Sequence, residues 1–323
     1  MNLWPAEIIS VTEYAVQVYF PNRLINRANR STLQLQKAEV GPAFSNALGL
    51  SYNIRVVRGI VDFHTHAFPD DLAERAMKTL EREGGVNACL NGKISSLLGS
   101  MDRHGIERSV VCSIATKPSQ FEPIFAWSMK VKSDRIIPFP SFHPSDTQFN
   151  ERTRQIKGEG FKGVKFHPYY QDFNLDDDRL FPIYEGISKE NLIMVVHTGF
   201  DFAFPRIKKA DPLKIAKVKD AFPDLKLVAT HLGSWEQWQE VEELLIGKPV
   251  FMEISFSLEY LTKERARKMI LGHPPEYILF GTDSPWTGQG KTLSLLRGLD
   301  LGEELEGLIL SKNADDLLNS AGG

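Results

Sequence analysis

The sequence predicts an α/β fold, a closed (β/α)8 TIM barrel that begins near residue 58 and follows an N-terminal extension. Two observations support this prediction. From about residue 58 onward, short runs of β-branched residues alternate with amphipathic segments, a pattern typical of strand-helix units around a parallel sheet. The runs number eight, which is the number of strands in a barrel of this type.

The eight predicted strands are short and apolar. They cover residues 59–66, 108–116, 135–144, 163–168, 192–199, 225–233, 250–256 and 277–285. Between them, "DDLAERAMKTLERE" has apolar positions three and four apart, and "DPLKIAKVKDAF" begins with an N-cap Asp followed by Pro, as helices do. A doubly wound open sheet is the alternative, but its first strand-to-helix turn should carry glycines, and "HTHAFPDD" has none.

The N-terminal extension differs in character from the rest of the chain. Residues 1–57 are polar and turn-rich, contain no histidine and show no clear alternation, so we assign the barrel to residues 58–323. A poorly ordered extension is the simpler interpretation. The alternative is a cover over the bottom of the barrel or a contact in a homodimer.

Composition excludes several classes of partner. The 323 residues carry a formal net charge of −3, which provides no basic field for nucleic acid or an anionic membrane. No apolar stretch approaches the ~20 residues of a membrane span, and the N-terminus lacks a secretion signal. The two cysteines, Cys89 and Cys112, are too few for a disulfide framework. We therefore expect a cytoplasmic protein that acts on a small molecule.

Histidines and one aspartate gather where the predicted strands end, which is where barrel enzymes build their sites. Their strands are the first, fourth, fifth, sixth and eighth, and the residues are His64, His66, His167, His197, His231 and Asp283. His64 and His66, two apart on one strand, can face the same way and bind one ion. Asp62 would share that face and could hydrogen-bond a ligand imidazole. Imidazole and carboxylate suit zinc first, then Mn²⁺ or Fe²⁺.

The motifs on these strands resemble those of one superfamily. They are "VDFHTHAFPD", "GFKGVKFHPYYQDF", "LIMVVHTG", "LVATHLGS", "ILFGTDSPW" and the closing "ILSKNADDLL". Over about residues 59–320 the chain resembles the amidohydrolase superfamily. Within that superfamily it is similar to the amidohydrolase-related branch that includes aminocarboxymuconate semialdehyde decarboxylase and resorcylate decarboxylase. The motifs together are specific for the superfamily but for no particular substrate.

The resemblance implies a metal-dependent hydrolase barrel with one divalent ion. Carried over by position, it implies that the metal ligands are His64, His66, His197 and Asp283. His231 would be a catalytic residue beside the metal. Asp283 would be catalytic as well as a ligand, because a carboxylate that touches both ion and water can take the proton from that water.

Lys165 introduces an alternative, because a strand-four lysine in some superfamily members is carbamylated and bridges two metals. We expect one ion and an unmodified Lys165 that contributes charge to the substrate pocket with His167. Glu253 on the seventh strand is either part of the site or a satisfied polar residue of the barrel interior.

Loops are expected to set substrate specificity, above all residues 84–100 and 200–212. In the second loop, phenylalanines could wall the pocket and Arg206 could contact an anion, although loop aromatics also pack on neighbouring helices. Trp286 leaves the eighth strand beside Asp283 and is a further candidate for substrate binding.

Three functions compete on this basis. The first is hydrolysis of a small ester, lactone or amide by water activated on the ion. The second is non-oxidative decarboxylation, in which the ion anchors a substrate carboxylate and a protonated group replaces carbon dioxide. The third, a degenerate non-catalytic barrel, predicts missing ligands, and no expected ligand position is vacant. We favour hydrolysis because of the breadth of the superfamily.

Overall fold

A computed structural model describes residues 8–12, 15–19 and 59–322. The chain divides into two compact units, Met1–Arg58 and Gly59–Gly323. In the first unit, β1 (Ile8–Thr12) and β2 (Ala15–Tyr19) pair as an antiparallel hairpin, which the sequence did not lead us to expect. The remaining residues of the extension, and with them its interpretation as poorly ordered, a cover or a dimer contact, lie outside the described residues.

The second unit contains parallel strands in two hydrogen-bonded runs, ordered β3-β4-β5 and β10-β9-β8-β7-β6. All eight predicted strands are present, each shorter than its predicted range. They are β3 (Ile60–Thr65), β4 (Ile106–Cys112), β5 (Ile136–Phe139), β6 (Gly163–Phe166), β7 (Ile193–Val196), β8 (Lys226–Ala229), β9 (Phe251–Glu253) and β10 (Ile278–Leu279).

Backbone hydrogen bonds join the two runs at both seams and close the barrel. Between β3 and β10, the Phe63 N–H donates to the Phe280 carbonyl at 2.8 Å. Between β5 and β6, the Lys165 N–H donates to the Pro140 carbonyl at 3.0 Å. The predicted closed barrel, rather than an open doubly wound sheet, is therefore confirmed.

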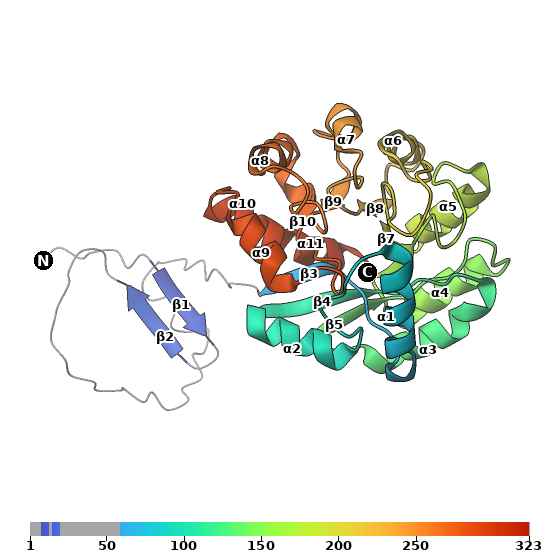
Figure 1. The fold of residues 1–323 in the computed structure, drawn as a ribbon, viewed down its shortest axis with the longest axis horizontal. Coiled ribbons are helices and arrows are strands. Elements are labelled where there is room, and N and C mark those ends of the chain that lie inside the picture. Colours follow the sequence, from blue (N-terminus) through green and yellow to red (C-terminus); the bar gives the residue numbers. More distant parts are fainter. Residues whose placement is uncertain (1–7, 13–14, 20–58, 323) are drawn as a thin grey trace, which may run out of the picture. The chain divides into compact units, whose positions relative to one another are not determined.

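Helices surround the strands (Figure 1). They are α1 (Asp70–Gly84), α2 (Ile94–His104), α3 (Phe121–Val131), α4 (Phe149–Gly158), α5 (Phe181–Lys189), α6 (Pro212–Ala221), α7 (Trp238–Leu244), α8 (Lys263–Gly272), α9 (Gln289–Arg297), α10 (Glu303–Gly307) and α11 (Asn313–Ser320). Within the described part of the chain, no helix is long and apolar enough to cross a membrane.

The local sequence accounts for most of these helices. The Asp211 carboxylate accepts a hydrogen bond from the Lys214 N–H and caps α6 as predicted. The closing "NADDLL" segment forms α11. The prediction of a loop over residues 84–100 is wrong in its second half, because α2 begins at Ile94 and buries Leu97 and Met101 at a helical spacing of four.

Side-chain alternation along the strands divides the apolar core into two clusters. Val195 on β7 and Val228 on β8 lie in one cluster, whereas their neighbours Val196 and Ala229 lie in the other. Lys165 on β6 pairs with Val195 in the parallel register, so its side chain points to the same face as that valine. A buried lysine on an apolar face needs a polar partner, and it finds one at the histidines that end the strands.

Candidate metal centre

The first three candidate ligands meet where β3 and β10 end. The Asp283 N–H donates to the His64 carbonyl at 2.7 Å, which holds the aspartate beside the histidine strand. The Nε2 atoms of His64 and His66 lie 3.1 Å apart. The Asp283 Oδ1 atom lies 3.1 Å from Nε2 of His66 and 3.4 Å from Nε2 of His64. Three donor atoms therefore converge on one point.

Hydrogen bonds fix which nitrogen of each imidazole carries the proton. The His66 Nδ1 atom lies 2.8 Å from the Cys112 carbonyl oxygen, which can only accept, so Nδ1 is the donor. The His64 Nδ1 atom likewise faces the Glu253 carboxylate at 3.1 Å. In the neutral form of each ring, Nε2 is then the atom without a proton, and the two Nε2 atoms face each other, an arrangement that a cation between them stabilises.

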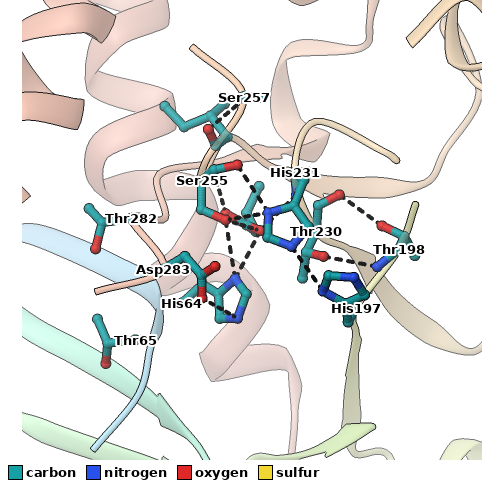
Figure 2. A network of polar contacts seen from close by, with 12 residues as sticks. His64, Thr65, His197, Thr198, Thr230, His231, Ser255, Ser257, Thr282 and Asp283 are labelled. Carbon is teal, nitrogen blue, oxygen red and sulfur yellow. Dashed lines mark hydrogen bonds and ion pairs between the residues drawn. The ribbon is translucent and has the colours of Figure 1, made fainter. Parts of the chain in front are cut away.

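A second pair of imidazoles repeats this arrangement (Figure 2). The His197 Nε2 atom donates to the Phe200 carbonyl at 3.1 Å, and the His231 Nδ1 atom donates to the Ser255 carbonyl at 3.2 Å. The His197 Nδ1 and His231 Nε2 atoms, which carry no proton in the neutral rings, lie 3.1 Å apart. The His64 and His231 ring centroids are 5.7 Å apart, so the two pairs are neighbours.

Burial keeps these groups in the forms that bind a metal. It lowers the pKa of His64, His167 and His197 well below the ordinary histidine value, so that their rings are neutral and able to donate lone pairs. Burial also lowers the pKa of Lys165, whose Nζ atom lies 2.9 Å from Nε2 of His64. The lysine is therefore close enough to donate a hydrogen bond to that ring nitrogen.

Glu253 ties the two histidine pairs together. Its Oε1 atom accepts hydrogen bonds from Nδ1 of His64 at 3.1 Å and from the His231 N–H at 2.9 Å. The carboxyl is fully buried on β9, and burial raises its pKa. Of the two interpretations of Glu253, the structure places it against the site, as the residue that orients two imidazoles.

The predicted contact between Asp62 and a ligand imidazole is wrong. Its carboxylate instead accepts hydrogen bonds from the His64 backbone N–H at 3.3 Å and from the Thr282 hydroxyl at 2.7 Å. Pairing of β3 with β4 shifts register between Asp62 and Thr65, so simple alternation does not hold there. Burial raises the pKa of Asp62 to about 7.

Two of the candidate residues have left-handed backbone. His231 has φ of 58° and Asp283 has φ of 59°, values that are uncommon for residues other than Gly and that Asn, Asp and His adopt more readily than most. Such a conformation costs of order 1–3 kcal/mol and persists where the surroundings impose it. Here it turns both side chains into the mouth of the barrel beside His64.

A second group of metal-type side chains lies next to the first. His167 stacks on His197 with ring centroids 4.1 Å apart, and its Nε2 atom lies 3.3 Å from the Asp201 carboxylate. The predicted ligand His197 belongs to this group rather than to the cluster of His64, His66 and Asp283. Sequence reasoning missed Asp201, four residues after His197 in a loop, and only that spacing could have suggested it.

The donors fit a divalent ion. Zinc-imidazole bonds are about 2.0–2.1 Å long, so donor atoms 3.1–3.4 Å apart can share one ion. The set of two imidazoles and one carboxylate suits zinc, manganese or iron. Among the described residues, His64, His66 and Asp283 form one of two such sets, and His167, His197 and Asp201 form the other.

A cavity of about 420 Å³ opens above these donors. Lys165, His167 and Trp286 line it, together with the histidine ligands. Arg206 does not line it, because its side chain is 61% exposed, pairs with Glu236 and covers the Phe200 ring at 4.3 Å. The predicted anion contact from Arg206 is therefore not part of the cavity wall.

Cys112 also lines the cavity without contributing a reactive thiol. Burial raises the pKa of Cys112 to about 12, so the thiolate is absent at neutral pH. Its carbonyl oxygen, which holds His66, is the functional part of the residue.

A closed parallel barrel with neutral imidazoles and a carboxylate at the carboxyl ends of its strands defines a metal-dependent barrel enzyme. The chain belongs to the amidohydrolase family, whose sequence pattern matches residues 61–319. A comparison with curated proteins gave no match.

Solved structures with this fold include three informative ones. An uncharacterised TIM-barrel protein from Bordetella bronchiseptica is 22% identical, with a TM-score of 0.67 over 82% of this chain and 99% of that one. A putative 2-pyrone-4,6-dicarboxylic acid hydrolase from Pseudomonas putida is 16% identical, with a TM-score of 0.57 over 82% and 98%. A dihydroxybenzoic acid decarboxylase from Polaromonas sp. JS666, with bound manganese and 2-nitroresorcinol, is 14% identical, with a TM-score of 0.60 over 81% and 97%.

Proposed function

We propose that the protein hydrolyses a neutral carbonyl compound, an ester, lactone or amide, with one divalent ion held by His64, His66 and Asp283 and assisted by His197. Zinc is the first choice of metal. The observation that carries the proposal is the charge of the cavity wall: apart from the ion and its proposed ligand Asp283, the wall offers one cationic side chain, Lys165, and one carboxylate, Asp201. A wall of this kind favours a neutral substrate over a polyanionic one.

The ion, when bound, would lower the pKa of water and polarise the substrate carbonyl. Asp283 supplies a carboxylate oxygen directed at the point where His64 and His66 converge, so it is placed to take a proton from water there. A bond then forms between the water oxygen and the carbonyl carbon, and the bond to the leaving oxygen or nitrogen breaks. The proton passes to that leaving atom.

His231 is placed to assist this proton movement. It lines the cavity, and because its Nδ1 atom donates to Ser255, Nε2 is the nitrogen that can accept a proton in the neutral ring. Glu253 and the left-handed backbone of His231 hold the ring in position. Lys165 beneath the cavity supplies an amine that can contact the carbonyl oxygen of a substrate.

Decarboxylation is the second candidate, favoured by the position of Lys165. Its amine lies 2.9 Å from Nε2 of His64 and could pair with a substrate carboxylate at the ion. The decarboxylase of Polaromonas, which holds manganese, shares the barrel fold.

Parallel assays separate the two candidates. The protein, purified with zinc or manganese, is incubated with aryl and alkyl esters, lactones and anilides, and separately with hydroxybenzoic acids while carbon dioxide is measured. We expect metal-dependent hydrolysis that is lost in Asp283→Asn, and no release of carbon dioxide. Carbon dioxide release without hydrolysis of any neutral substrate would show that the decarboxylase is correct.

A further inference from the structure

Four aromatic side chains form a continuous strip that leads out of the cavity. We call Phe202, Trp235, Phe256 and Tyr260 the aromatic strip. The Phe202 ring lies 4.1 Å from Trp235 and 5.2 Å from Phe256, measured between centroids. Tyr260 stacks on Phe256 at 5.6 Å and contacts Trp235 edge-on at 5.7 Å. Each ring therefore touches at least two others.

The aromatic strip runs from the buried site to the surface. Trp235 and Phe256 are only 5% and 7% exposed and line the cavity. Phe202 also lines the cavity but is 41% exposed, and Tyr260 is 48% exposed. Large exposed aromatics that continue a cavity wall are typical of a binding surface rather than of the core.

Aliphatic side chains form another part of the cavity wall. They come from α1, α3 and the segments after α1 and β4, and they are Leu72, Leu80, Val86, Ile114 and Ile124. Polar groups are confined mainly to the floor, where the histidines, Lys165 and Asp283 lie. A ligand in this cavity therefore meets polar chemistry at one end and apolar surface along the rest of its length.

We propose that the cavity takes a bulky substrate with a flat aromatic body and a single reactive carbonyl group, with little or no negative charge. The carbonyl would reach the floor and the aromatic body would lie along the aromatic strip. The reaction in this inference rests on the proposed hydrolysis. The substrate class rests on the cavity wall alone. A volume of about 420 Å³ accommodates a two-ring aromatic compound.

Binding is tested without any reaction. Calorimetric titration of the zinc-loaded protein with 2-naphthol, naphthalene-2-sulfonate and naphthalene-2,6-disulfonate varies charge on one ring system. We expect 2-naphthol to bind at least about tenfold more tightly than the disulfonate. Equal or tighter binding of the disulfonate would overturn the inference even if esters are hydrolysed.

Turnover of esters then tests whether the preference for an aromatic body also holds in the reaction. The kcat/KM of each ester is first divided by its rate of alkaline hydrolysis. We expect this ratio to rise from ethyl acetate to phenyl acetate to 2-naphthyl acetate, by roughly fourfold or more for each added carbon atom that the cavity buries. If no ester is hydrolysed but 2-naphthol still binds, the proposed function fails and the inference on substrate class stands. A preference for ethyl acetate contradicts the inference.

Variants test whether the aromatic strip is responsible for binding 2-naphthol. Phe202→Ala should weaken 2-naphthol binding and raise KM for 2-naphthyl acetate about tenfold, whereas Phe202→Leu should lose less because it keeps apolar area. Zinc content should not change. Leu271→Ala is the matched control, because Leu271 is 48% exposed near the end of α8 that leads to the start of β10, opposite the site. Identical binding by Phe202→Ala and the wild type would overturn the assignment.

Discussion

At the scale of single residues, each imidazole of the site gives its one N–H to a fixed acceptor. His64 uses the Glu253 carboxylate, whereas His66 and His197 use backbone carbonyls. A carbonyl oxygen cannot donate, so in the neutral ring the opposite nitrogen has no proton, and it points at another nitrogen of the same kind. Four unprotonated nitrogens in two facing pairs are unfavourable without a cation and favourable with one.

The first prediction removes one of these donors. His64→Ala or His66→Ala should lose both bound metal and activity, because each deletes one of only a few protein ligands. Metal content is measured by plasma emission and turnover against the substrate found above. His104→Ala, which changes an exposed histidine far along the chain, is the control and should keep both. A full equivalent of metal in both site variants would remove the basis of the proposed centre.

The second prediction distinguishes a ligand from a catalyst. His231→Asn should keep the metal and lose turnover by roughly 10²- to 10⁴-fold, the usual contribution of a general acid or base. Metal content and kcat are measured on the same preparation.

Two other outcomes are informative for His231. A metal-free variant would mean that the unprotonated Nε2 atom, 3.1 Å from His197, binds the ion directly. Normal turnover with metal bound would reduce His231 to a structural residue. Asp283 or His167 would then be the better candidate for proton transfer.

Single residues also show where sequence reasoning stops. Histidines at strand ends could be recognised because their chemistry and their position agree. Asp201 and Arg206 lie in a loop, where no periodicity says which side chain turns inward, and the inward one is Asp201. Asp62 contacts backbone instead of an imidazole, because a register shift in β3 cannot be read from alternation.

At the scale of elements, strand type and order were predictable, and strand ends were not. Each predicted strand extended one or more residues beyond the observed strand, because the apolar pattern continues past the last paired residue. Thus the fifth run extended to Gly199, whereas β7 ends at Val196. The missed helix α2 has the sequence "ISSLLGSMDRH", whose Ser and Gly residues hid its helical spacing.

The third prediction concerns the contact between the segments after β7 and β8. Gly199 has φ of 90°, and a Cβ there would lie 2.0 Å from the Trp235 nitrogen. Gly199→Ala should therefore lower the free energy of unfolding by about 2–5 kcal/mol, through a strained conformation and a backbone clash.

Urea unfolding measures this change. Gly158→Ala is the control, because Gly158 ends α4 and a Cβ there meets nothing within 4 Å. The control should stay within about 1 kcal/mol of the wild type. Equal stability of both variants would show that the two segments do not approach so closely.

At the scale of the whole molecule, ligands from distant parts of the sequence couple the metal to folding. His64 and Asp283 are separated by most of the barrel sequence and meet only when the barrel closes. An unfolded chain does not hold such donors together, so an ion that binds the folded state alone adds its binding free energy to stability.

The fourth prediction follows for metal removal. Zinc at a free concentration a hundred times its Kd should stabilise the protein by about 2.7 kcal/mol, and chelation should lower Tm by roughly 5–10 °C. Differential scanning calorimetry with and without chelator measures the shift. His64→Ala should show almost no response to zinc. A shift of the same size in that variant would place the stabilising ion elsewhere.

The fifth prediction concerns the number of ions. We expect close to one tightly held ion per chain and an unmodified Lys165, whose amine contacts His64. Plasma emission gives the number of ions and intact mass gives the state of the lysine. Two tightly held ions, or the added mass of a carbamate, would assign the protein to the binuclear class.

The proposed metal ligands and the side chains of the cavity wall come from different parts of the chain, which has a consequence for engineering. His64 and His66 are anchored by Glu253 and Cys112 on the strands, whereas Phe202 and Val86 come from the segments between strands and helices. Libraries randomised at Phe202 and Val86 should yield altered selectivity at little risk to expression, because neither side chain makes a hydrogen bond to a proposed metal ligand. The barrel and its metal ligands can thus be kept unchanged while variants with new substrate preferences are selected.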